Sequence, residues 1–267
     1  MAADPAPQIR PAPTAGVELS RRLLAEFLGT GLLVTAVIGS GIMAVRLAPG
    51  QPGLQLLANS LATVFALAAL ILMFGPVSGA HFNPVVSAAD WWLGRRTGTG
   101  LRPSELAVYT AAQVLGAIGG AILANTMFGL PAVTAASHDR TGGPLWLGEI
   151  VATTGLLLLI AALTYSHRTA LAPAAVAAWI GGAYWFTSST SFANPAVTIG
   201  RAFSDTVAGI APASVPAFVA AQLLGLVLAV GLVAALYPTG RNIVDDDPFV
   251  THHDDITENR TVLPERN

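Results

Sequence analysis

Hydrophobic residues run along this chain in six stretches of about twenty that avoid charged side chains. A helix of about twenty apolar residues is long enough to cross the hydrocarbon layer of a membrane, so each stretch predicts one membrane-spanning helix. The six predicted spans are Leu23–Ala44, Gln55–Phe74, Leu106–Phe128, Leu145–Tyr165, Leu171–Ser189 and Val215–Leu236. No convincing cleavage site follows the first span, so we expect it to be retained rather than removed as a secretory signal.

Both ends of the chain are polar. Residues 1–20 contain four prolines, and residues 239–267 contain seven acidic side chains. Such segments lack the apolar surface that would hold them against a core. We therefore expect two disordered tails and one folded domain between them, at residues 21–238. The acidic run Asp245–Asp247 and the histidines after it could bind a metal, but we interpret them as part of a solvated tail.

Composition supports a lipid environment. Hydrophobic residues make up 53% of the chain, charged residues 10%, and the mean hydropathy is +0.62. An average soluble domain is about one quarter charged, so a water-soluble fold is nearly excluded. The net charge of −2 offers no basic face for nucleic acid, and the absence of cysteine excludes disulfides and thiolate metal sites. Phosphate loops, catalytic triads and metal-ligand spacings are also missing, so we expect no enzyme, no cofactor and no metal.

The arginines predict the orientation of the spans. Six spans place both termini on one side of the membrane, and that side carries ten of the thirteen arginines. The opposite side carries only Arg46, Arg140 and Arg201. Cytoplasmic loops hold an excess of positive charge, so we expect both termini in the cytoplasm and the protein in the inner (plasma) membrane.

An internal repeat divides the chain into two halves, at about residues 21–130 and 144–238. Three motifs recur in the same order: a glutamate near the start of the first span (Glu26, Glu149), an asparagine–proline pair (Asn83, Asn194) and an Ala-Ala-Gln triplet (Gln113, Gln222). Each half has three spans, an odd number, so the two copies must have opposite orientations in the membrane. Inverted repeats of this kind build their sites near the midplane.

The asparagine–proline pairs predict two helix starts inside the membrane. Pro84–Leu93 and Pro195–Phe203 are too short to span but could enter halfway as helices. Asparagine suits the N-cap and proline the first helical position. Such a start is tolerated in a membrane only where it is buried or lines water. Two half-helices meeting at the centre would direct their positive ends to one point, which opposes cations and leaves the asparagine amides as donors to a passing oxygen.

These residues together resemble the aquaporin and aquaglyceroporin family of major intrinsic proteins, from about Arg21 to Pro238. The matching motifs are Asn83-Pro84-Val85 with its lead-in Ser78–Phe82, Asn194-Pro195-Ala196, and the paired glutamates and glutamines. The resemblance implies an all-α membrane protein with an hourglass fold of six transmembrane helices and two re-entrant half-helices. It also implies a homotetramer in the lipid bilayer, with one pore per subunit that conducts water or small neutral solutes passively.

The resemblance further implies roles for three polar residues beside the half-helices. In this family, glutamates at the positions of Glu26 and Glu149 accept hydrogen bonds from the half-helix loops. An intramembrane carboxylate is costly, so it needs such partners. His81 could gate the pore because histidine titrates near neutrality, but we interpret it as a hydrogen-bonded support residue.

The predicted selectivity filter departs from the family pattern. Most members have alanine where Val85 stands and arginine where Val197 stands. Counting without gaps from the two asparagines places the filter at Thr63, Gly182, Ser191 and Val197. This set contains no aromatic ring, no histidine and no arginine, so the filter should be wide and uncharged. Pore width and lining donors set the selectivity of such channels.

Two charged residues are predicted at the ends of the half-helices. Arg201 stands four residues after Val197 and on the same helical face, so it could be a displaced filter arginine. Asp90 occupies the equivalent place in the first repeat. We therefore interpret both as pore-mouth residues, Asp90 on the cytoplasmic side and Arg201 on the outer side.

The filter bears on the solute. Glycerol-conducting members share a glycine at the Gly182 position but keep aromatic side chains that are absent here. Members with an arginine-free filter occur in bacterial arsenic-resistance settings. We therefore expect a passive channel for glycerol-like polyols, trivalent metalloid hydroxides such as arsenite, and water. The alternatives are an ordinary water, glycerol or urea channel, an ion-leaky pore, and a coupled secondary transporter, since transporters also use inverted repeats.

Overall fold

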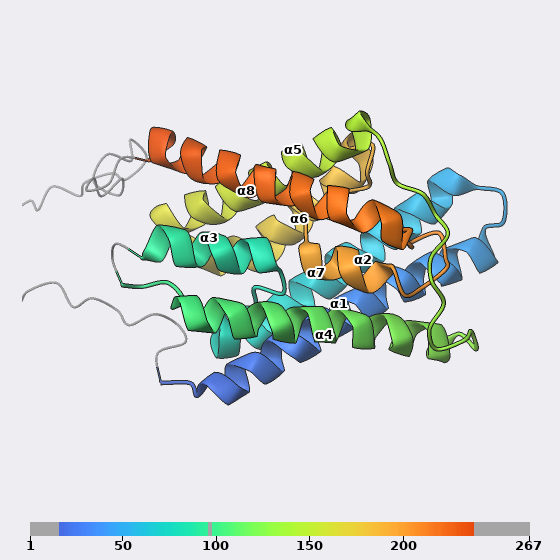
Figure 1. Cartoon of the computed structure of the whole chain (residues 1–267), viewed down its shortest axis with the longest axis horizontal. Helices are drawn as coiled ribbons and strands as arrows, with labels where there is room; N and C mark the ends of the chain where they lie inside the picture. Colours follow the sequence, from blue (N-terminus) through green and yellow to red (C-terminus); the bar gives the residue numbers. More distant parts are fainter. Residues whose placement is uncertain (1–15, 96–97, 238–267) are drawn as a thin grey trace, which may run out of the picture.

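The computed structural model describes residues 16–95 and 98–237, which form helices and no strand. The long helices lie roughly side by side, and both ends of the described chain lie at the same end of the bundle (Figure 1). The helices are α1 (Leu19–Leu47), α2 (Pro52–Ser78), α3 (Pro84–Gly94), α4 (Pro103–Met127), α5 (Gly143–Tyr165), α6 (Ala172–Phe186), α7 (Pro195–Arg201) and α8 (Val215–Leu236), with short 3-10 turns at Thr169–Leu171 and Pro212–Ser214. We call the end with the termini the terminal face and the opposite end the loop face.

Six helices in the described part of the chain are long and apolar enough to cross a membrane, which confirms a multi-pass membrane protein. They are α1, α2, α4, α5, α8 and α6, the last two extended by the 3-10 turns before them. Helix α1 begins four residues before its predicted span and ends three residues after it. The helix extends beyond the apolar stretch because its backbone hydrogen bonds continue where polar side chains can reach the membrane–water interface.

Two predicted helices end two or three residues earlier in the structure. The fifth helix ends at Phe186 rather than Ser189, because Thr187 is extended and the chain turns back into the bundle. The second half-helix ends at Arg201 rather than Phe203. Of the predicted tails, residues 1–15 and 239–267 lie outside the described part of the chain, whereas Leu19 and Ser20 belong to α1.

The two short helices confirm the predicted inverted arrangement. Helix α3 begins near the middle of the bundle and runs toward the terminal face, whereas α7 begins near the middle and runs toward the loop face (Figure 1). The half-helices therefore point their N-termini at each other. Six spanning helices and two re-entrant half-helices form the predicted all-α hourglass fold.

Glycines allow the closest helix packing. Helix α1 packs along α4, α5 packs along α8, and α2 meets α6 across the two halves. A Cβ added at Gly116 would collide with the carbonyl oxygen of Phe27, and one added at Gly120 would collide with that of Gly31. Helices that approach at their backbones need small residues at the contact. This contact fixes α1, and with it Glu26, against α4.

Candidate functional site

The two asparagines cap the half-helices as predicted from the sequence. Asn83 is in extended conformation and its Oδ1 accepts a hydrogen bond from the Val85 amide at 3.1 Å. Asn194 Oδ1 accepts from the amides of Ala196 at 3.0 Å and Val197 at 3.2 Å. These amides have no partner within a helix at its first turn, so each asparagine side chain stabilises a helix start inside the membrane.

The same asparagines tie the two halves together. Asn83 Nδ2 donates to the carbonyl oxygen of Ala193 at 2.8 Å, and Asn194 Nδ2 donates to that of Phe82 at 2.8 Å. The side-chain amide of asparagine carries two N–H groups, and each of these amides uses one of them on a carbonyl of the described chain. That leaves one N–H of each side-chain amide without an acceptor in the described chain.

A fully buried carboxylate holds the loop before α3. Glu26 Oε1 accepts from the Ser78 hydroxyl at 2.7 Å and from the His81 amide at 3.0 Å. Its Oε2 accepts from the Phe82 amide at 2.7 Å and from Gln113 Nε2 at 2.7 Å. Four donors replace the water that a carboxylate would otherwise bind, which makes the buried charge tolerable.

Glu149 repeats this arrangement in the second half. Its carboxylate accepts from the amides of Phe192 and Ala193, both at 2.8 Å, and from Gln222 Nε2 at 2.6 Å. Gln222 Nε2 also donates to Thr198 Oγ1 at 2.9 Å, as Gln113 does to Ser87 Oγ in the first half at 3.0 Å. The repeated motifs of the sequence are therefore the members of two matching hydrogen-bond networks.

The loops before the half-helices adopt a strained backbone. Five non-glycine residues in these loops have positive φ: Ala80, Phe82, Thr190, Ser191 and Ala193. All of them except Thr190 stand one or three positions before an asparagine. Such residues rarely adopt this conformation, and they persist only where the surroundings fix them. Two of them, Phe82 and Ala193, direct their amides to the buried glutamates. Gly79 marks the start of the loop before α3, but the loop before α7 contains no glycine, and sequence reasoning missed both turns.

His81 lies in a support network at the terminal-face end of the α3 loop. Its Nδ1 is 3.1 Å from Ser87 Oγ, and its ring packs 5.6 Å from that of Tyr109. The Tyr109 hydroxyl in turn donates to the Ser78 carbonyl at 3.0 Å. His81 thus contacts α3 and α4, and Tyr109 links α4 to the end of α2.

The structure buries three of the four predicted filter residues. Thr63, Ser191 and Val197 are all at most 5% exposed, whereas Gly182 lies on the exposed side of α6. The hydroxyl of Ser191 is buried and without a partner in the described chain. A Cβ added at Gly182 would meet only the Phe186 ring within 4 Å.

Tyr184 is a residue that sequence counting missed. It lies two positions after Gly182, on the buried side of α6, and its hydroxyl is 3.2 Å from Thr63 Oγ1. Counting along the chain gives the distance from Asn194 but not the rotation of α6. The structure thus brings Thr63 together with an aromatic hydroxyl from the other half of the chain.

The two predicted mouth residues have internal partners. Asp90 Oδ2 accepts from the Leu101 amide at 2.8 Å, which ties α3 to the segment before α4. Arg201 is only 2% exposed, donates its Nε to the Ala208 carbonyl and lies over the Phe192 ring. It is enclosed because α7 ends at Arg201 and the following residues fold back over it.

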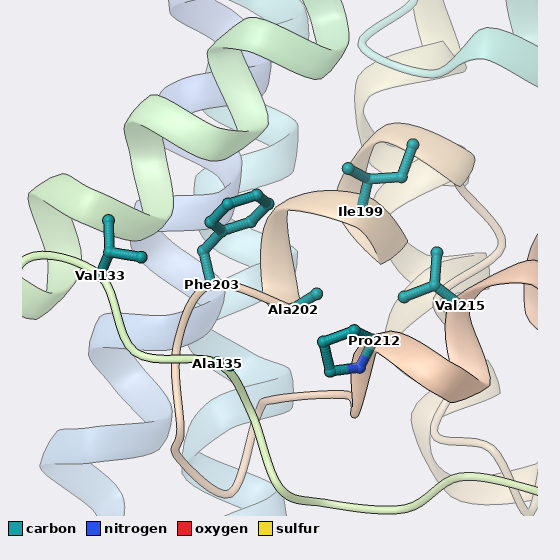
Figure 2. A pocket seen from close by; sticks show the side chains of 7 residues that line it. All are labelled: Val133, Ala135, Ile199, Ala202, Phe203, Pro212 and Val215. Atoms are coloured by element: carbon teal, nitrogen blue, oxygen red, sulfur yellow. The ribbon is translucent and has the colours of Figure 1, made fainter.

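One cavity is lined only by apolar side chains and is not suited to a polar solute. It measures about 280 Å³ and lies between the loop after α4, the end of α7 and the start of α8 (Figure 2). Its lining residues are Val133, Ala135, Ile199, Ala202, Phe203, Pro212 and Val215. None of these side chains offers a hydrogen bond.

Known proteins share both the sequence and the fold. The family profile "Major intrinsic protein" matches residues 14–188. The chain is 48% identical to aquaglyceroporin AqpS of Rhizobium meliloti over 227 residues, covering 85% of this chain and 94% of that protein. It is 31% identical to aquaporin AqpM of Methanothermobacter marburgensis over 216 residues, 72% of this chain and 86% of that protein.

A solved structure agrees with the helical arrangement. The aquaglyceroporin of Plasmodium falciparum superposes with a TM-score of 0.60 at 21% identity, covering 86% of this chain and 100% of that one. At this identity the likeness concerns the fold alone. The family profile, the relatives and the paired half-helices agree: the chain belongs to the major intrinsic protein family, which consists of membrane channels and not of enzymes.

Proposed function

We propose that this protein is a passive channel for small uncharged solutes, with a filter wide enough for glycerol-like polyols and for arsenite as well as water. The observation that carries the proposal is Val197. Its amide bonds to Asn194 Oδ1 at 3.2 Å, which fixes this residue in the first turn of α7, where most family members have an arginine. A valine there leaves more room and no charge.

The lining groups suit a polyol. Such a solute needs hydrogen-bond donors for its hydroxyls and apolar contacts for its carbon atoms. The free N–H groups of Asn83 and Asn194 and the hydroxyl of Ser191 would supply the first. The buried side chains of Val85 and Val197 would supply the second. The similarity to an aquaglyceroporin at 48% identity supports the same class of solute.

Arsenite fits the same chemistry. Arsenous acid is neutral near pH 7 and carries three hydroxyls, so a pore meets it as a compact polyol. A wide, uncharged filter neither repels nor holds such a molecule, and conduction requires that a solute can leave as well as enter. Trivalent metalloid hydroxides are therefore within the proposed range.

We place the channel in the inner (plasma) membrane as a homotetramer with both termini in the cytoplasm. Among the described residues, the loop face carries three arginines, Arg46, Arg140 and Arg201, and the terminal face carries five. The side with more positive charge is expected to face the cytoplasm. Large apolar side chains are exposed along the spanning helices, for example Leu72, Val227 and Phe65. Lipid or neighbouring subunits would cover them.

Swelling of proteoliposomes in water, glycerol, urea and arsenite tests the proposal. The wild type is expected to conduct water, glycerol and arsenite above the level of empty vesicles. Val197→Arg is expected to lower glycerol and arsenite flux at least about fivefold and water flux less, because a guanidinium narrows the filter. Val197→Met adds length without charge and is the matched control. Equal glycerol flux in the wild type and Val197→Arg would show that Val197 does not set the width.

A further inference from the structure

The loop between α4 and α5 crosses the loop face (Figure 1), and it contains Arg140. Arg140 is 7% exposed. Its Nε donates to the Gly209 carbonyl at 2.9 Å, and its Nη1 and Nη2 donate to those of Ser189 at 3.4 Å and Val207 at 3.2 Å. The backbone amide of Arg140 donates to Ser214 Oγ at 3.1 Å. Arg140 is therefore held in place from the segments on both sides of α7.

Arg201 brings a second guanidinium to the same place. Its Cζ lies 3.5 Å from the centre of the Phe192 ring, and that of Arg140 lies 5.0 Å from the same centre. Both side chains are buried, and the hydrogen bonds that they make in the described chain go to neutral carbonyl oxygens. Two positive charges thus share one aromatic ring.

Neither charge has a carboxylate partner in the described part of the chain. Its ion pairs join Glu105 to Arg22 and Arg102, at the terminal face. Burial lowers the pKa of Arg140 to about 10, which still leaves the group protonated at neutral pH.

The acids of the neighbouring loops are bound elsewhere. Asp139 accepts from the hydroxyls of Thr141 and Ser214, both within 2.9 Å, and these bonds lower its pKa. The amide and hydroxyl of Ser137 bond to Asp205 and lower its pKa likewise. Both acids are therefore ionised and held by neutral donors, and neither forms an ion pair with the two arginines. Glu149 is the carboxylate that acts electrostatically on both arginines, and it is bound by its own network and forms no ion pair with them.

The arginine pair borders a cavity of about 130 Å³ on the loop-face side of the predicted filter. Gln55, Asn59 and Thr190 also line this cavity. Asn59 lies one helical turn before Thr63, Thr190 directly precedes Ser191, and Arg201 lies one turn beyond Val197. Because Asn59, Thr190 and Arg201 line the cavity, it lies next to the predicted filter, on its loop-face side.

We propose that Arg140 and Arg201 together form the charge barrier of this channel, so that the loop-face cavity admits neutral, oxygen-rich solutes and repels cations. The inference rests on the proposed channel function. Val197 carries no positive charge. Arg201 supplies one a helical turn beyond Val197, and Arg140 supplies another from the loop between α4 and α5. Guanidinium N–H groups without protein acceptors would bind the oxygens of an entering solute, and a cation would meet two positive charges that form no ion pair in the described chain.

Potassium leak of proteoliposomes, followed with a potential-sensitive dye and divided by water flux, tests this barrier. The ratio is expected to rise at least about tenfold in the double variant Arg140→Gln/Arg201→Gln, because both charges are gone. Gln55→Glu leaves the arginines intact but adds a carboxylate to the cavity, and it is expected to raise the ratio as well. Gln51→Glu adds the same charge one turn earlier, at an exposed position, and should match the wild type.

The outcomes separate the barrier from the channel itself. If the double variant fails to fold, the ratio of potassium leak to water flux in Gln55→Glu tests the barrier instead. A ratio that stays at the wild-type value in the folded variants overturns the inference while leaving the channel function intact. A wild type that conducts neither water nor glycerol overturns the proposed function and this inference together.

Discussion

Replacing Glu149 by glutamine is expected to destabilise the protein by more than about 3 kcal/mol and to abolish solute flux. The carboxylate accepts from the amides of Phe192 and Ala193 and from Gln222 Nε2. Glutamine has the same shape but exchanges one acceptor oxygen for an NH2 group, which would face a donor. At least one buried N–H loses its partner, and the loop before α7 loses the contact that holds its strained backbone. Thermal unfolding in detergent and vesicle flux measure both effects.

Two companion variants make the Glu149 result specific. Glu18→Gln is the same chemical change at an exposed residue without a side-chain cap bond, and it should leave the melting temperature unchanged. Glu26→Gln should cost at least as much as Glu149→Gln, because Glu26 accepts four hydrogen bonds rather than three. If Glu149→Gln had the same melting temperature as Glu18→Gln, the buried carboxylates would not hold the half-helix loops in place.

Replacing Gly120 by leucine is expected to cost about 3 kcal/mol or more, because the side chain would be forced against backbone rather than against a movable side chain. An added Cβ at Gly120 collides with the carbonyl oxygen of Gly31, so α1 and α4 must separate. Separation would also move Glu26 away from Gln113, since these residues lie on the same two helices. The measurement is the yield and melting temperature of purified protein.

The neighbouring glycine gives a matched control. An added Cβ at Gly119 would meet only the Phe27 ring, at 3.9 Å, which is an ordinary contact. Gly119→Leu changes the same helix and the same residue type one position away, and should fold with nearly wild-type stability. A similar loss of stability in both variants would mean that leucine in this helix is harmful for a reason other than the α1–α4 contact.

The sequence was informative where a pattern repeats. Apolar stretches of membrane-spanning length predicted the six long helices, and the doubled asparagine–proline pairs predicted two helix starts with their caps. Both signals are local, because span length and capping depend on neighbouring residues. The hydrogen-bond partners of Glu26 and Glu149 were expected only through resemblance to a family.

The sequence did not predict side-chain positions and backbone conformations that depend on distant segments of the chain. The rotation of α6, which turns Tyr184 toward Thr63, follows from packing between the two halves of the chain. The burial of Arg201 depends on a return loop, and the place of Arg140 depends on carbonyls that lie 49 to 69 residues further along. Positive φ at Ala80 and Ser191 is imposed by the networks around the loops, and neither residue type signals it.

The most direct test of a passive pore is the initial rate of glycerol entry into proteoliposomes, measured against glycerol concentration with and without a proton gradient. A pore lined by Asn83 and Asn194 should give a rate that rises linearly with concentration and does not respond to the proton gradient. A rate that saturates at low glycerol and depends on the proton gradient would contradict it, because that behaviour belongs to a coupled transporter.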